Sequence, residues 1–190
     1  MLNNRSDKIN PLPTLSFLKL SEIRIQINSY DDIFSDFDPN VYAERTLSDD
    51  FLLHAKKISK NIRGKKMSLR FLLPENKRNQ EEEKAIIKRL QFYFKSVHQQ
   101  LKAAISKTKR SGFIFSISGV ALMIAASYIS FSKPEQYFIH LMLILFEPAG
   151  WFLLWVGLDL LVYSSKETGK ELSFYSKMIK SEINFFTHNN

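Results

Sequence analysis

The sequence predicts a mostly helical protein in which a cytoplasmic α+β module is followed by a two-helix transmembrane hairpin and a C-terminal amphipathic helix. Three observations predict this fold class. Alternating and helical patterns follow one another up to residue 111, two long apolar segments fill most of the remainder, and the 190-residue chain has no cysteine. Charge divides at the same place: residues 1–111 hold 22 Lys and Arg against 13 Asp and Glu, whereas residues 112–190 hold 5 against 6.

Residues 1–78 are expected to form the α+β module. Glu22–Ile27 and Met67–Leu73 alternate apolar with polar side chains, as half-buried strands do. The helical segment between them favours a crossover that joins parallel strands. Because two strands alone make too small a sheet, either Leu15–Leu20 supplies a third strand or a neighbouring subunit covers the exposed face.

Two helices are expected before the membrane. The first, Asp49–Arg63, has Ser48 as its N-terminal cap. The second occupies residues 79–111 and leads to the membrane, and Asn79 with Glu82 makes a capping box at its start. Its apolar stripe has the average spacing of a straight amphipathic helix and consists of Ile86, Leu90, Tyr93, Val97, Leu101 and Ala104.

A transmembrane hairpin is expected over residues 112–163, with spans at Gly112–Phe131 and Tyr137–Tyr163. The first span is 20 residues without a charge, which at about 1.5 Å of rise per residue matches a hydrocarbon core of roughly 30 Å. A buried helix of a soluble core would need a larger protein around it. Lys and Arg flank the outer ends of both spans, whereas the connecting residues offer only Lys133, so both termini are expected in the cytoplasm.

Residues 164–190 are expected to form a cytoplasmic tail helix. Thr168 and Glu171 make a capping box at its start. Its apolar stripe consists of Leu172, Tyr175, Ile179, Ile183 and Phe186. The helix would pack on the α+β module, which we favour, or lie along the inner membrane surface.

Polar residues inside the second span are the strongest candidates for function. Glu147 lies ten residues inside the span, where an unpaired carboxylate is costly, and His140 is close to the same helical face. Asp159 is near enough to the cytoplasmic end to reach water. Pro148 and Gly150 are expected to kink the helix. Two interpretations stay open: Glu147 lines a pore or acts as a protonatable switch, or it hydrogen-bonds a serine of the first span or a neighbouring subunit.

Two groups of cations are candidate contacts for an anion or a lipid head group. One consists of Lys56, Lys57, Lys60, Arg63, Lys65 and Lys66, and the other of Lys107, Lys109 and Arg110. The first group has the charge to hold a nucleotide or a nucleic acid. The helix dipole and a nearby anionic membrane explain these cations more simply, so nucleic acid is not an expected partner.

An enzyme is not expected. With four histidines and no cysteine, the chain lacks a glycine-rich phosphate loop, a nucleophile elbow and a two-histidine zinc helix, so no catalytic residue, cofactor or metal site is predicted. The acidic segment Asp31–Phe51 has the first ligand spacings of a calcium loop at Asp36, Asp38 and Asn40. Val41 and Leu47, however, stand where such a loop needs glycine and glutamate.

This acidic segment, together with the EPAGW of Glu147–Trp151, resembles an uncharacterised group of small bacterial two-span membrane proteins over most of the chain. The resemblance implies the bacterial cytoplasmic (inner) membrane and carries no activity. We expect an oligomeric channel or pore-type effector gated through its cytoplasmic module, because two spans cannot enclose a pathway alone. The alternative is a membrane-anchored adaptor that recruits a cytoplasmic partner. The expected partners are the lipid bilayer, further copies of the chain, and a cytoplasmic protein or nucleotide signal.

Overall fold

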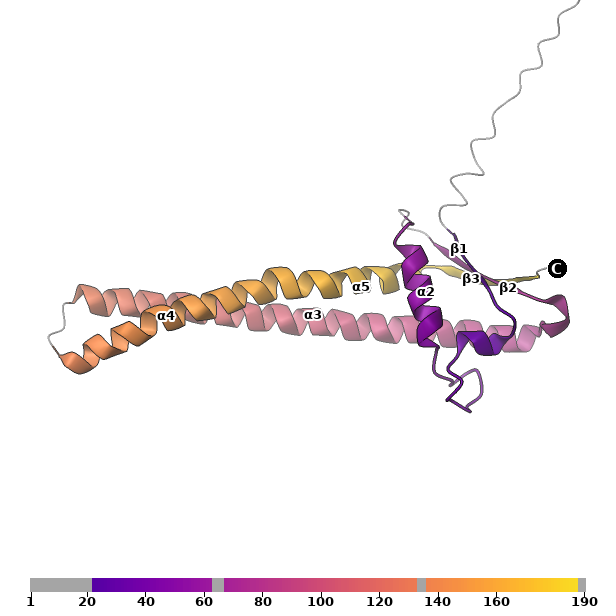
Figure 1. The fold of residues 1–190 in the computed structure, drawn as a ribbon, viewed down its shortest axis with the longest axis horizontal. Coiled ribbons are helices and arrows are strands. Elements are labelled where there is room, and N and C mark those ends of the chain that lie inside the picture. The colour runs from indigo at the N-terminus through magenta and orange to yellow at the C-terminus, as the bar shows by residue number, and fades with distance from the viewer. Residues whose placement is uncertain (1–21, 63–66, 133–135, 188–190) are drawn as a thin grey trace, which may run out of the picture. The chain divides into compact units, whose positions relative to one another are not determined.

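The computed structural model describes residues 22–62, 67–132 and 136–187, which are mostly helical (Figure 1). The chain divides into two compact units, Met1–Phe94 with Ser176–Asn190 and Lys95–Tyr175. The first unit is therefore built from two separate stretches of the sequence, and the second unit is an insertion between them. One helix, α3 (Gln80–Phe131), contributes to both units.

The first unit is built on a three-stranded parallel sheet with the order β1-β2-β3. β1 (Glu22–Gln26) pairs with β2 (Ser68–Leu73), which pairs on its other side with β3 (Glu182–Thr187). The central Phe71 lies opposite Ile25 in one neighbour and Phe185 in the other. The first two strands and their parallel pairing confirm the expectation from the alternating patterns.

The core of the first unit lies on one face of this sheet. Phe71 is fully buried, with its ring centroid 5.8 Å from that of Phe51 in α2 (Asp49–Ser59) and 5.0 Å from that of Phe185. The start of α3 adds the fully buried Ile86, Leu90 and Phe94. Complete burial of each such side chain contributes about 1.5–3 kcal/mol. The expected core face of α3 is thus confirmed at Ile86 and Leu90, while Phe94 lies in the core in place of the half-buried Tyr93.

The C-terminal segment corrects the expected tail helix. α5 (Ser165–Ile179) ends before β3, so Ile183 and Phe186 are strand residues and not the last turns of an amphipathic helix. Ile183 is buried and its neighbours Glu182 and Asn184 are exposed, which is the alternation of a strand. Pairing with β2 satisfies the backbone groups of both strands, and this tertiary effect outweighs the local helical spacing. The third strand therefore comes from the C-terminus. Leu15–Leu20 lies outside the described residues.

The second unit contains the apolar hairpin. α3 continues as one helix through Gly112, and α4 (Tyr137–Asp159) is followed by the π-helical segment η3 (Leu160–Ser164) and by α5. Two helices of the described chain, Gln80–Phe131 and Tyr137–Ile179, are long and apolar enough to cross a membrane. Only 17% of the most apolar window of each is buried within the protein, whereas a core helix of a soluble protein would be mostly buried. Their composition therefore suggests membrane association.

Candidate functional site

Within the second unit, α3 and α4 run side by side in opposite directions and meet at two pairs of glycines (Figure 1). A methyl group built at Gly119 would lie 2.6 Å from the Leu154 nitrogen and 2.7 Å from the Gly150 carbonyl oxygen. One built at Gly112 would lie 2.9 Å from the Gly157 carbonyl oxygen. The two glycines of each helix are seven residues apart, which places both of them on one face of that helix. Small residues let two helix backbones pack closely. Such packing stabilises helix association in a membrane, where the hydrophobic effect does not drive helices together.

A groove of about 810 Å³ opens on this hairpin beside Glu147. It is lined by Met123, Ser127, Ser130 and Phe131 of α3 and by Glu147 and Trp151 of α4. Glu147 is exposed, and ten residues of helical rise place it about 15 Å from Tyr137, near the middle of a 30 Å core. This Glu147 groove therefore brings together one carboxylate near the middle of the second span and two hydroxyl groups nearer the Phe131 end of the first span.

The expected hydrogen bond from Glu147 to a serine of the first span is not formed within the described residues. Ser127 lines the same groove as Glu147 but is not hydrogen-bonded to it, and Ser118 is exposed. Ser116 lies in the glycine contact with its hydroxyl oxygen buried and without a hydrogen-bond partner in the described part of the chain. The Glu147 carboxylate is therefore available to water or to a neighbouring chain.

The other polar candidates of the second span lie outside the Glu147 groove. His140 and Asp159 are exposed on α4. His140 is seven residues before Glu147, which places it on the same side of the helix about 10 Å away along the axis. α4 continues through Pro148, and Gly150 is buried at the contact with α3. Sequence reasoning assigned Gly150 to a kink and missed this packing role, although the equal spacing of glycines in both spans was a readable signal.

The two candidate cation groups belong to different units. Lys57 and Lys60 are exposed at the end of α2, Lys56 is half-buried, and Arg63, Lys65 and Lys66 lie outside the described residues. Lys107, Lys109 and Arg110 are exposed on the part of α3 that belongs to the second unit. The exposed cations of both groups are accessible to a lipid head group or to another anion.

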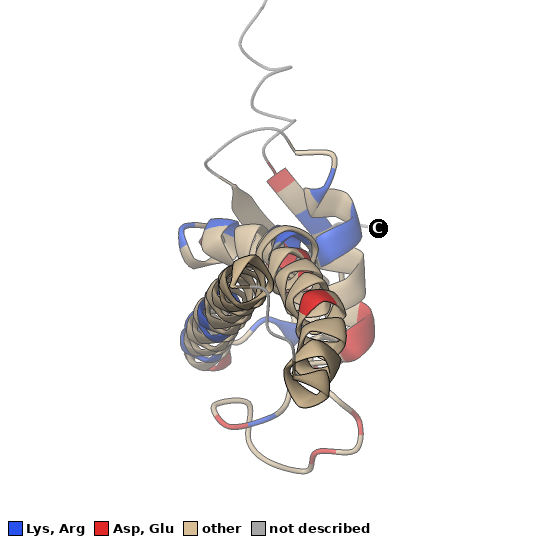
Figure 2. Ribbon diagram, turned by 90° about the vertical axis from the view of Figure 1, so that its left-hand side faces the viewer, with Lys and Arg blue, Asp and Glu red and all other residues tan. Residues whose placement is uncertain are grey.

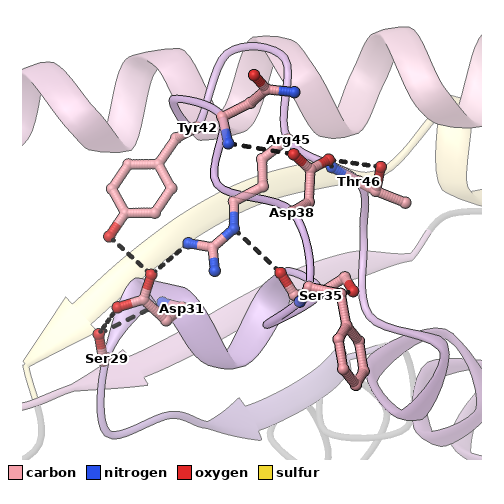
Figure 3. Close-up of polar contacts among 9 residues, drawn as sticks. Ser29, Asp31, Ser35, Asp38, Tyr42, Arg45 and Thr46 are labelled. Atoms are coloured by element: carbon pink, nitrogen blue, oxygen red, sulfur yellow. Dashed lines mark hydrogen bonds and ion pairs between the residues drawn. The ribbon is translucent and has the colours of Figure 1, made fainter.

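The acidic segment of the first unit forms a loop that its own side chains hold in place (Figure 3). Arg45 forms an ion pair with Asp31 and donates a 3.2 Å hydrogen bond from Nε to the carbonyl oxygen of Ser35, while Tyr42 donates to Asp31 at 3.3 Å. Partial burial works to raise the pKa of the Asp31 carboxyl. Hydrogen bonds from Arg45, Ser29 and Tyr42 outweigh that effect and hold the pKa below its usual range. We call residues 34–47 the pinned loop.

Asp38 fixes the tip of the pinned loop. Its carboxylate accepts hydrogen bonds from the hydroxyl and the backbone N–H of Thr46, both at 2.7 Å, and from the Asn40 N–H at 3.1 Å, which together lower the pKa of Asp38 to about 2. Its oxygens are thus used within the loop, and no group of three or more His, Cys, Asp or Glu among the described residues could hold a metal ion. The neighbouring Phe37 is 97% exposed. The hydrogen-bonded loop therefore presents an exposed aromatic ring to solvent.

A buried carboxylate joins the short helix η1 (Tyr30–Ile33) to the start of α3. Arg78 donates to both oxygens of Glu83 at 2.8 and 2.9 Å, and Tyr30 donates to the first of them at 3.0 Å. The Tyr30 oxygen also accepts a 2.9 Å hydrogen bond from the Asn79 N–H. The Arg78 bonds lower the pKa of Glu83, and burial raises the pKa of Tyr30. This network fixes the first turn of α3 against η1 within the first unit.

Comparison with protein-family models, with curated proteins and with solved structures finds no match.

Proposed function

We propose that this protein is an integral protein of the bacterial cytoplasmic membrane, with both termini in the cytoplasm, that assembles into an oligomeric channel or pore-type effector. In this proposal Glu147 faces the central path, and the α+β unit receives a cytoplasmic protein or nucleotide signal that gates it. The cations that flank the outer ends of the two spans support the orientation.

The observation that carries the proposal is the position of Glu147. An ionised carboxylate that faces hydrocarbon at the centre of a span is costly, by about 3 kcal/mol even on the scales that give the smallest penalty. Glu147 has no partner among the described residues of its own chain and shares its groove with Ser127 and Ser130. Copies arranged with these grooves toward one axis would surround the carboxylates with water. Rings of acidic side chains at such positions select and conduct ions.

The connectivity supports gating through the first unit. α3 begins seven residues after β2, and β3 begins three residues after α5, so both ends of the hairpin are tied to neighbouring strands of one sheet. A signal that alters this sheet would act on both helices of the hairpin. Allosteric coupling of this kind requires a second arrangement of the same elements, with different affinity for the signal.

Ion flux through the purified protein in liposomes tests the proposal. Glu147→Gln removes the charge at nearly constant volume and should change ion selectivity or gating while the oligomer remains intact. Asp159→Asn is the matched control, because it removes a carboxylate from the same helix outside the Glu147 groove and should leave selectivity unchanged. Two outcomes would remove the channel and assign Glu147 to helix packing. One is the absence of ion flux under every signal tried. The other is that Glu147→Gln behaves like wild type while Glu147→Leu dissociates the complex.

A membrane-anchored adaptor is the second candidate, and Phe37 favours it. A 97% exposed aromatic ring on a rigid loop is typical of an anchor that enters a pocket on another protein. If the liposomes show no flux and Phe37→Ser abolishes co-purification of a cytoplasmic protein with the full chain, the adaptor is the correct function.

A further inference from the structure

The first unit carries a second groove, of about 530 Å³, between the pinned loop and the first turns of α3. Its apolar lining includes Val41, Ala43 and Ala85. Its charged lining residues are Glu81, Glu82 and Arg45, and Arg45 is already paired with Asp31, which leaves the two glutamates as the unpaired charges. Val41 is 71% exposed. The carboxylates of Glu81 and Glu82 have no hydrogen bond or ion pair among the residues that the structure describes. We call this the acidic groove, because it is an apolar groove with a negatively charged rim.

The outer face of α2 has the complementary chemistry. Leu53, Lys57 and Lys60 follow one another at spacings of four and three residues, which places them on one face of the helix. Leu53 is 63% exposed, and both lysines are exposed and without a partner among the described residues. Figure 2 shows Lys and Arg gathered toward one end of α2 and Asp and Glu toward the other. We call Leu53, Lys57 and Lys60 the α2 stripe.

We propose that the α2 stripe of one copy binds in the acidic groove of the next copy. Leu53 would lie against Val41 and Ala85, and the two lysines would lie beside Glu81 and Glu82. Charge complementarity and the matching exposed apolar residues select a second copy as the occupant, because both halves of the contact are on this chain. The inference rests on the proposed function, since it requires an oligomer.

The contact is heterologous, because the acidic groove and the α2 stripe share no residue. Heterologous contacts that close on themselves form a ring with a single rotation axis. A pore lined by one Glu147 from each copy requires that symmetry. The contact thus gives the cytoplasmic units a fixed order around the same axis as the hairpins.

The proposed contact is small, since it consists of one leucine and two exposed ion pairs, and exposed pairs contribute little in isolation. It would act between copies that the membrane segments already hold together, where the effective concentration of the partner surface is high. Its role is therefore to position the units, which makes proximity a better readout than dissociation.

The chain has no cysteine, so disulfide trapping can test the contact without a background. Val41→Cys and Leu53→Cys are placed on two differently tagged full-length chains, co-expressed in the membrane and treated with a mild oxidant. The mixed covalent dimer should form at least about tenfold more than either variant forms alone, because a heterologous contact brings residue 41 to residue 53 and not to itself. Gln91→Cys, exposed on α3, replaces Leu53→Cys as the matched control.

Charge reversal supplies the second arm. Lys57→Glu with Lys60→Glu in the Leu53→Cys chain should suppress the mixed dimer about tenfold, and Glu81→Lys with Glu82→Lys in the partner chain should restore it. Lys84→Glu with Lys88→Glu, the same charge change on α3, should leave the yield unchanged.

The inference fails if the wild-type protein is oligomeric in detergent but the mixed dimer does not exceed the Gln91→Cys control, or if charge reversal is not rescued. A monomeric wild-type protein would remove the proposed channel together with this contact, so the two failures are distinguishable.

Discussion

The contact between α3 and α4 predicts a ranked response to alanine substitution at three glycines. At Gly119 the added methyl group would meet backbone atoms of Leu154 and Gly150 at 2.6 and 2.7 Å. At Gly150 it would meet the movable Met123 side chain at 2.6 Å, and the nearest backbone atom, the Gly119 carbonyl oxygen, is at 3.1 Å. At Gly169 in α5 it would meet nothing within 4 Å.

The magnitudes follow from these distances. Relief at Gly119 to an ordinary separation of about 3.4 Å needs the two helices to separate by roughly 0.8 Å, and overpacking of this kind costs about 1–3 kcal/mol. Replacing glycine inside a helix gains about 0.8–1 kcal/mol of intrinsic propensity at every one of the three positions. We therefore expect Gly119→Ala to destabilise the hairpin, Gly150→Ala to be nearly neutral, and Gly169→Ala to stabilise it by up to about 1 kcal/mol.

Unfolding of the full-length protein in mixed micelles, followed by circular dichroism as the denaturing detergent is increased, measures the three free-energy changes. Gly169→Ala is the internal control for helix propensity. The described packing of α3 on α4 is wrong if Gly119→Ala is as stable as Gly169→Ala, or if Gly150→Ala is the most damaging of the three.

Three other predictions concern the first unit and the membrane. Tyr30→Phe removes the hydrogen bonds to Glu83 and from Asn79 and should lower the free energy of unfolding by about 1–2 kcal/mol. Tyr42→Phe removes a 3.3 Å bond that lies nearer the surface and should lower the free energy of unfolding less. Equal thermal midpoints for the two variants would contradict the network. Because the folded pKa of Asp38 is about 2, below its ordinary value of 3.8, the unfolded chain binds more protons between these values and stability should fall as pH drops through this window. Asp38→Asn should flatten that part of the thermal-midpoint profile, and an unchanged slope would refute the loop assignment. The protein should stay in the membrane pellet after alkaline extraction, and protease outside spheroplasts should leave tags on both termini intact; release by alkali or loss of either tag would overturn the topology.

Local patterns were sufficient for the elements whose burial follows from neighbours in sequence. The alternation at Glu22–Ile27 and the apolar length of Gly112–Phe131 each express one simple requirement, a half-buried sheet face and an apolar cylinder. The structure accordingly has β1 and a continuous helix at these places. Glu147 stood out for the same reason, since a carboxylate at mid-span conflicts with its surroundings.

The remaining features depend on partners distant in sequence. Ile183 and Phe186 fit a helical stripe, and only the open edge of β2, more than 100 residues earlier, makes their segment a strand. The exposure of Phe37 likewise depends on contacts outside its own position, because the Asp38 and Arg45 hydrogen bonds hold its loop. Both grooves likewise arise where two helices, or a loop and a helix, meet, and no single window of sequence contains both sides.

In the proposed channel several copies place Glu147 around a water-filled path. The most direct test is a density map of the full-length protein purified in lipid nanodiscs. We expect a ring of copies with an open axis, Glu147 facing that axis at the middle of the membrane, and the cytoplasmic units arranged around it. A monomer, or a solid bundle in which Glu147 is hydrogen-bonded between packed helices with no open path, would contradict it.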